Sequence, residues 1–115
     1  MSREFIELLL RLAEQRRYIL ERLPAVLEAV KKAAKELDPE AEVLLFGSYV
    51  RGGFRPDSDI DVLVVSKYGK SLRQAAEMVK HIEDRVGDIW PIEIHVWDRE
   101  TFEKFKKMVG PYRPV

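Results

Sequence analysis

The chain has 115 residues, of which 46% are hydrophobic, and a chain of this length is expected to form one small domain with its own core. Its twenty basic and twenty acidic residues cancel, so it lacks the general positive charge that draws proteins to long nucleic acid. Cysteine is absent, which excludes disulfides, thiolate nucleophiles and cysteine-based zinc sites.

The N-terminal third is predicted to form two helices. Apolar residues recur at helical spacing with charges between them, which predicts an amphipathic helix that ends or kinks near Pro24. A second helix follows and ends at Asp38 and Pro39. We assign residues 1–37 to this helical pair and residues 40–110 to the core of a single domain that spans 1–115. The apolar residues that keep helical spacing in the first helix are Phe5, Leu8, Leu9, Leu12, Ile19 and Leu23. The stripe expected to be buried in the second helix consists of Val26, Leu27, Val30, Ala33, Ala34 and Leu37.

The first helix carries more apolar surface than one domain face requires, because Leu8, Leu9 and Leu10 follow one another. Two interpretations are open. Either the helix packs entirely on its own domain, or part of it forms an interface, which could join two copies of the chain. The basic residues farther along the helix are interpreted as a solvated face; they are Arg16, Arg17 and Arg22.

Two strands are predicted on either side of a glycine-containing loop. Residues 43–46 form a short apolar run that ends at Gly47, where the lack of a side chain lets a ligand approach the backbone. Ser48 stands where a helix could begin, and its hydroxyl and the free amides of such a start would suit an anion. Residues 52–57 hold two glycines and a proline, which predicts a loop, and the β-branched run at 60–65 predicts the second strand.

The second half of the chain alternates between helix and strand. Ser71, with Gln74 three residues later, resembles a capping box and is expected to begin a third helix. Strict alternation of apolar and polar residues over 91–97 predicts a strand. Asp98 can cap a fourth helix that a Gly-Pro pair ends, and residues 111–115 are expected to be a tail. The predicted fold class is therefore mixed α/β.

Two carboxylates stand at the start of the second predicted strand. Side chains two apart on a strand share a face, so Asp59 and Asp61 are expected to project together and to converge on one cation or bridge two. Oxygen ligands of this kind suit Mg²⁺, which often completes its shell with substrate phosphates. Taken alone, an Asp-x-Asp sequence is more often a solvated turn than a metal site.

The motif as a whole is more specific than its parts. Its members are Gly47, Ser48, Arg51, Gly52, Ser58, Asp59, Ile60, Asp61 and Val64. At this spacing the pattern resembles the minimal nucleotidyltransferases of the polymerase-β-like superfamily, and the resemblance covers roughly residues 40–105. It implies the fold of that superfamily, a small mixed sheet flanked by helices.

Members of this family use a third carboxylate on a later strand, and the resemblance gives that role to Glu93. Many relatives carry Asp there, so the longer Glu93 departs from the common pattern. The alternative is a charged side chain on the solvated face of an edge strand. His95 shares the face of Glu93, but because Mg²⁺ prefers oxygen we interpret His95 as part of the site wall and not as a ligand.

The resemblance implies transfer of a nucleotidyl group, AMP from ATP, to a hydroxyl acceptor. The implied catalytic and metal-binding residues, which would hold two Mg²⁺ ions, are Asp59, Asp61 and Glu93. The implied nucleotide-binding residues are Gly47, Ser48, Arg51 and Ser58. Arg51 has a second interpretation, since it could instead brace the loop by pairing with an acidic neighbour.

The acceptor is expected to come from a partner. Minimal nucleotidyltransferases are often paired with a small helical protein of the HEPN class and act as antitoxins that adenylylate a tyrosine of that toxin, so a HEPN-type partner is implied. Two alternatives are a binding module that is catalytically weak or inactive and neutralises its partner by contact, and a small-molecule nucleotidyltransferase. The latter would generally need extra helices to shape an acceptor pocket.

The expected location is the cytoplasm. No stretch is long and apolar enough to cross a bilayer, and the charged residues among the N-terminal leucines do not fit a signal peptide. Asparagine is missing and charged residues reach 35%, a profile that indicates a heat-adapted source.

Overall fold

The computed structural model describes residues 1–52 and 58–115, so most of the loop predicted at 52–57 lies outside the described residues. The α-helices are α1 (Arg3–Glu21), α2 (Leu23–Leu37), α3 (Ser48–Arg51), α4 (Leu72–Val86) and α5 (Arg99–Val109), and η1 (Lys67–Lys70) is a 3-10 helix. The strands are β1 (Glu42–Phe46), β2 (Ile60–Val65), β3 (Ile92–Trp97) and β4 (Tyr112–Pro114).

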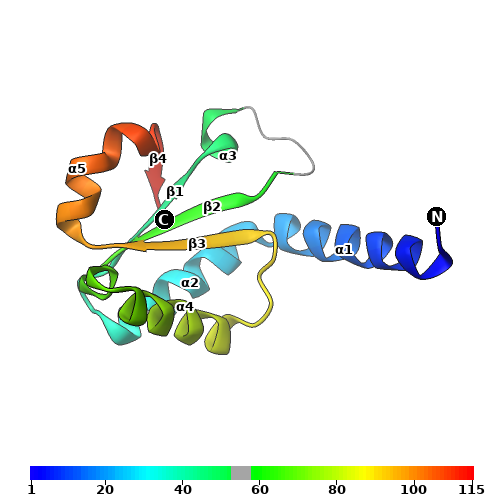
Figure 1. The fold of residues 1–115 in the computed structure, drawn as a ribbon, viewed down its shortest axis with the longest axis horizontal. Coiled ribbons are helices and arrows are strands. Elements are labelled where there is room, and N and C mark those ends of the chain that lie inside the picture. Colours follow the sequence, from blue (N-terminus) through cyan, green and yellow to red (C-terminus); the bar gives the residue numbers. More distant parts are fainter. Residues whose placement is uncertain (53–57) are drawn as a thin grey trace.

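The strands within the described ranges form one mixed sheet in the order β3-β2-β1-β4 (Figure 1). β1 pairs with β2 in antiparallel fashion, whereas β3 pairs with β2 in parallel after the chain has crossed over through α4. The mixed α/β class predicted from the sequence is confirmed. The parallel register sets Asp61 opposite Glu93 on neighbouring strands.

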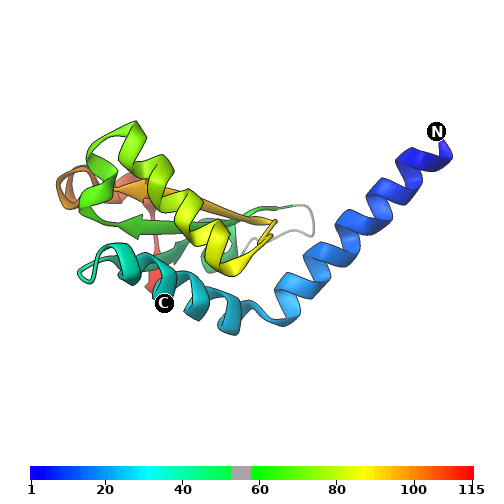
Figure 2. The same cartoon turned by 90° about the horizontal axis from the view of Figure 1, so that it is seen from below.

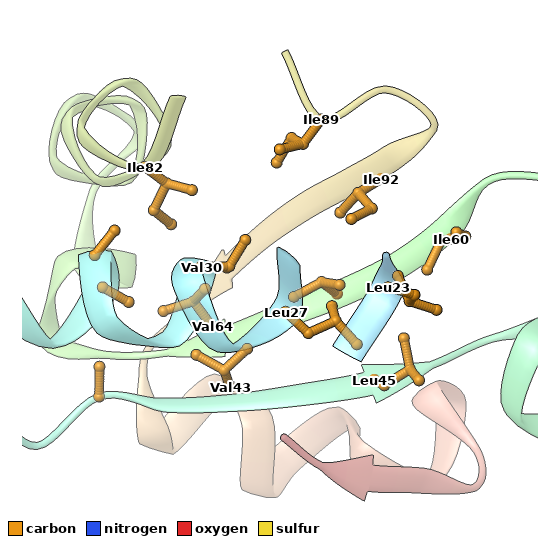
Figure 3. Close-up of a cluster of buried hydrophobic side chains, with 14 of the residues drawn as sticks. Leu23, Leu27, Val30, Val43, Leu45, Ile60, Val64, Ile82, Ile89 and Ile92 are labelled. Atoms are coloured by element: carbon orange, nitrogen blue, oxygen red, sulfur yellow. The ribbon is translucent and has the colours of Figure 1, made fainter. Parts of the chain in front are cut away.

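Helices α2 and α4 cover one face of the sheet. Alternate strand residues point toward these helices, and Figure 3 shows Val43, Ile60 and Val64 meeting Leu27 and Val30 of α2. Met78 and Ile82 of α4 are fully buried in the same cluster. Each side chain of this size contributes about 2 kcal/mol when it leaves water, so this face supplies most of the core.

The other face of the sheet is covered by α5. Its smaller buried cluster consists of Leu44, Leu63, Val65, Phe102 and Val109. Asp61 and Glu93 lie on this same face but outside the buried cluster, because side chains on a strand alternate and Asp61 is two residues from Leu63. One end of this face is therefore left open to solvent.

Helix α1 projects from the body as an arm, with the N-terminus at its far end (Figures 1 and 2). All of residues 1–14 are exposed, and only the last part of α1 is anchored. There Ile19 is buried, and the Gln15 side-chain amide donates hydrogen bonds to the carbonyls of Asp88 (3.1 Å) and Trp90 (3.3 Å). No helix in the described part of the chain is long and apolar enough to span a membrane.

The ends of the helices follow local sequence signals. The break between α1 and α2 falls at Arg22, and Pro24 lies in the first turn of α2, where its missing N–H costs nothing. Ser71 Oγ accepts a hydrogen bond from the Gln74 amide at 3.1 Å, and Asp98 Oδ1 accepts one from the Thr101 amide at 2.9 Å. Both predicted N-caps are confirmed.

A buried polar pair joins α2 to the end of β2. The Ser66 hydroxyl donates to Asp38 Oδ2 at 2.6 Å, and the Glu40 amide donates to Asp38 Oδ1 at 3.0 Å. Burial by itself would raise the pKa of Asp38, but the hydrogen bonds from Ser66 and from the backbone of Glu40 and Lys67 outweigh it and hold the pKa below its ordinary value. Asp38 thus acts as a charged acceptor that connects the end of α2 to the end of β2.

The prediction that residues 111–115 form a tail is wrong. β4 pairs antiparallel with β1, the Val115 amide donates to the Val43 carbonyl at 2.9 Å, and Lys31 Nζ donates to the Val115 carbonyl at 3.0 Å. A three-residue strand that contains a proline gives no alternating pattern of its own. It is a strand because β1 offers it an unpaired edge, which the local sequence does not reveal.

Candidate functional site

The open end of the sheet brings three possible metal ligands together. Asp61 on β2 lies opposite Glu93 on β3, and His95 follows Glu93 by two residues on the same face. His95 Nε2 is 3.4 Å from Asp61 Oδ1 and 3.9 Å from Glu93 Oε1. One ligand atom from each residue lies within 4.8 Å of the other two. Adjacent parallel strands in register thus create the cluster.

These three side chains are partly exposed to solvent, and one of them, His95, also packs against a neighbouring ring. The Asp61 side chain is 27% exposed, that of His95 35% and that of Glu93 53%, so a ligand can reach all three. The ring of Phe46, which is opposite Asp61 on β1, lies 5.5 Å from the His95 ring and limits how it can turn. The sequence predicted that His95 lines the site. In the structure its Nε2 lies close enough to the Asp61 and Glu93 carboxylates for all three residues to contact one ion.

Gly47 lies directly against Asp61. Its φ of +79° and ψ of −158° belong to a region that side chains avoid, and a Cβ atom built there would overlap the Asp61 carboxylate. The turn that follows β1 can therefore pass close to the carboxylate only because residue 47 is a glycine. This packing makes the glycine turn and the carboxylate strand neighbours.

The single turn of α3 continues from this glycine. Ser48 is its first residue and is half-buried, and the Gly47 carbonyl accepts hydrogen bonds from the amides of Val50 and Arg51, both at 3.1 Å. Arg51 is exposed at the end of the turn and makes no ion pair with a residue in the described part of the chain. The bracing role considered for Arg51 gains no support from these residues.

Asp59 and Ser58 come just before β2. Asp59 is exposed and does not belong to the cluster of Asp61, Glu93 and His95. Ser58 is half-buried, and its carbonyl accepts a 2.6 Å hydrogen bond from Arg16 of α1. The structure therefore brings Asp61 together with Glu93, whereas Asp59 lies just before the start of β2 and outside the cluster.

Arg16 was missed by the sequence analysis, which placed it on a solvated helix face. Besides its bond to Ser58, its guanidinium lies 5.1 Å from the centre of the Trp90 ring. Arg16 thus ties the arm to the segments that lead into β2 and β3. No local signal could have shown this, because the contact spans 42 residues of sequence.

The chemistry of the cluster fits a divalent cation. Two carboxylates supply the hard oxygen donors that Mg²⁺ requires, and the nearby imidazole nitrogen would be accepted more readily by Mn²⁺ or Zn²⁺ than by Mg²⁺. The glycine turn beside Asp61 leaves backbone accessible to a second, anionic ligand. A cation shared with a phosphate group is therefore what this arrangement is suited to hold.

The family follows from comparison with known proteins. The model of the nucleotidyltransferase domain family matches residues 27–114, which span the whole sheet and every residue of the candidate site. The chain belongs to the nucleotidyltransferase domain family. The match begins within α2, so the projecting α1 lies outside it.

Named relatives narrow the class. The chain is 38% identical over 68 residues to the protein adenylyltransferase MntA of Thermococcus cleftensis, a match that spans 59% of this chain and 69% of the relative. It is 33% identical over 60 residues to a Methanocaldococcus jannaschii protein named "Putative protein adenylyltransferase MJ0141", spanning 48% of this chain and 61% of the relative. The chain is thus a minimal nucleotidyltransferase similar to MntA.

A solved structure supports the fold. The crystal structure of a protein named "putative nucleotidyltransferase" superposes with a TM-score of 0.63 at 28% identity, covering 76% of this chain and 95% of the other. The mixed four-stranded sheet described above is accordingly the polymerase-β-like nucleotidyltransferase fold that the motif predicted.

Proposed function

We propose that the protein is a Mg²⁺-dependent nucleotidyltransferase that moves AMP from ATP to a hydroxyl group of a protein partner. The observation that carries the proposal is the facing pair of Asp61 and Glu93 with Gly47 packed against Asp61. This is a cation site directly beside a turn that can admit phosphate. Both named relatives are called protein adenylyltransferases, which supports AMP as the transferred group.

In this proposal Asp59, Asp61 and Glu93 hold Mg²⁺, and the whole domain, residues 1–115, works as one catalytic unit. When bound, the metal supplies positive charge that neutralises the phosphates and favours ionisation of the attacking hydroxyl. Asp61 and Glu93 are already paired across two strands, whereas Asp59 would join them from the segment before β2. Positioning and charge neutralisation then account for catalysis, so no covalent nucleophile is needed.

The nucleotide would lie along the motif turn. Gly47 gives the phosphates access to the backbone, Ser48 offers a hydroxyl, and the exposed Arg51 offers a charge that no described acidic residue neutralises. Ser58, whose carbonyl is held by Arg16, borders the same site. The acceptor oxygen attacks the α-phosphorus, the bond to the β-phosphate oxygen breaks, pyrophosphate leaves, and the hydroxyl proton is released to solvent.

The acceptor in this proposal is a small helical protein of the HEPN type, with the chain acting as its antitoxin. Helices α2, α4 and α5 cover the sheet and α1 projects from the body as an arm, so the hydroxyl is proposed to come from a partner and not from a pocket formed by the described helices. A hydroxyl presented by a partner would reach the open end of the sheet, where the Glu93 side chain is more than half exposed.

The test is transfer of label from [α-³²P]ATP in the presence of Mg²⁺ to the partner with which the chain is purified. Asp61→Asn is expected to abolish labelling, on the order of 100-fold or more. Asp84→Asn is the matched control, since Asp84 is an exposed aspartate of α4 that among the described residues pairs with Lys80 alone. If the wild type labels nothing with any of the four nucleoside triphosphates, the proposal is wrong.

A second candidate, a nucleotidyltransferase-like module that neutralises a partner by contact alone, is favoured by two observations. Asp59 lies outside the cluster that contains Asp61, and His95 stands close to the Asp61 carboxylate. The double variant Asp59→Asn/Asp61→Asn separates the two functions. If it suppresses the partner as fully as the wild type does, contact and not chemistry neutralises the partner.

A further inference from the structure

The projecting half of α1 exposes a large apolar surface. Six of its large apolar side chains are each between 38% and 60% exposed; they are Phe5, Ile6, Leu8, Leu9, Leu10 and Leu12. Soluble monomers rarely leave contiguous apolar patches of more than a few hundred Å² uncovered. This surface is distinct from the candidate site and lies outside the region matched by the nucleotidyltransferase family.

The exposed residues continue the stripe that α1 buries where it meets the body. Leu12 lies seven residues before the buried Ile19, and Phe5 lies seven residues before Leu12, so all three share one side of the helix. Leu8 and Leu9 complete the stripe between them. The stripe is buried against the body at Ile19 and exposed to solvent from Phe5 to Leu12, so the exposed part would be stabilised by packing against a second apolar surface.

Charged residues beside the stripe indicate which surface packs against it. Glu4 precedes Leu8 by four residues and Arg11 follows it by three, so the two charges flank the stripe on the same edge. Neither makes an ion pair with any residue of the ranges 1–52 and 58–115. When two α1 helices run antiparallel around a centre between Leu8 and Leu9, Glu4 of each copy comes level with Arg11 of the other to within about one helical turn.

We propose that this protein forms a dimer through antiparallel pairing of the projecting half of α1 with the same segment of a second copy. The two-fold symmetry repeats each contact, so Phe5 packs against Leu12 of the other copy twice and the Glu4–Arg11 pair also forms twice. Pairing covers the exposed parts of Phe5, Leu8, Leu9 and Leu12 on each copy, so the interface is of the small class that is typical of weak association.

The geometry of the arm suits this pairing. The stripe from Phe5 to Leu12 lies within the exposed residues 1–14, and the body begins where Gln15 and Arg16 make their contacts. Figure 2 shows the arm leading away from the body, so a second arm can lie along it with the two bodies at opposite ends. The paired stripe contains none of the residues of the candidate site, so this proposal does not rest on the proposed function.

Sedimentation equilibrium of the full chain tests the pairing. At concentrations of tens of micromolar the wild type is expected to have twice the monomer mass of 13.4 kDa. Leu8→Glu/Leu12→Glu should weaken association by on the order of 100-fold, because it sets four charges within the paired stripe. Circular dichroism and the melting temperature show that the variant body remains folded. A wild type that is monomeric at 100 µM overturns the proposal.

A charge exchange tests the antiparallel arrangement without altering the apolar stripe. Glu4→Arg and Arg11→Glu should each weaken association by about five- to tenfold, because each replaces two attractive pairs with two repulsive ones. The double variant Glu4→Arg/Arg11→Glu should restore wild-type association. Arg17→Glu, a matched charge reversal beyond the paired segment, should leave it unchanged. A double variant that associates no better than the single variants rules out this arrangement.

Discussion

Replacing Gly47 with alanine should disable the site while keeping the rest of the fold. The backbone conformation of Gly47 strains any other residue by roughly 1 to 3 kcal/mol. The new Cβ would also overlap the Asp61 carboxylate, and forcing a methyl group into occupied space adds about 1 to 3 kcal/mol. Because Asp61 is partly exposed and can swing outward, the total loss of unfolding free energy should be about 2 to 4 kcal/mol.

Gly87→Ala is the matched control for this change. Gly87 ends α4 with φ +90° and ψ −157°, nearly the conformation of Gly47, but a Cβ there would meet nothing within 4 Å. Urea unfolding of both variants separates the shared backbone strain from the collision with Asp61. Gly47→Ala should also lose on the order of 100-fold in Mn²⁺ affinity or nucleotidyl transfer, and Gly87→Ala should lose neither. Equal behaviour of the two variants in both assays would refute the argument.

Further predictions concern Asp38 and Arg16, each of which links a helix to one end of β2. Asp38→Ala should lower the unfolding free energy by about 2 kcal/mol, since it strands the Ser66 hydroxyl. The pKa of Asp38 is held below its ordinary value of 3.8, so the ionised carboxylate stabilises the fold above that pH. This stabilisation is lost as the pH falls through the folded-state pKa. The unfolding free energy of Asp38→Asn should therefore fall less steeply in acid than that of the wild type. Arg16→Ala should raise hydrogen exchange around Ser58 and in the second half of α1, whereas Arg17→Ala, at an exposed neighbour, should not.

Most of the helices and strands could be predicted from local sequence patterns. The β-branched run that became β2 and the strict alternation of β3 were visible without a structure, and each fixed which side chains share a face. Since Asp61 and Glu93 lie on two such strands, only the parallel pairing of the strands was needed to bring them together. The family resemblance gave Glu93 the role of third carboxylate, but the parallel pairing itself came from the structure.

Contacts between distant segments could not be predicted. β4 exists because the edge of β1 was unpaired, and the hydrogen bond from Arg16 to Ser58 depends on how α1 leaves the body. The nearness of His95 to Asp61 depends on side-chain rotation against Phe46, which neither strand pattern specifies. Each of these features arises from tertiary packing, and the contacts of Arg16 and His95 lie at the candidate site.

A double-mutant cycle across the facing carboxylates tests the central claim most directly. Mg²⁺-dependent transfer of label from [α-³²P]ATP is measured for the wild type, Asp61→Asn, Glu93→Gln and the double variant, with Glu83→Gln on the exposed side of α4 as control. If the two carboxylates form one metal site, each single variant loses nearly all transfer and the double variant is no worse than either. Full activity of Glu93→Gln, or losses that multiply in the double variant, would contradict a shared site.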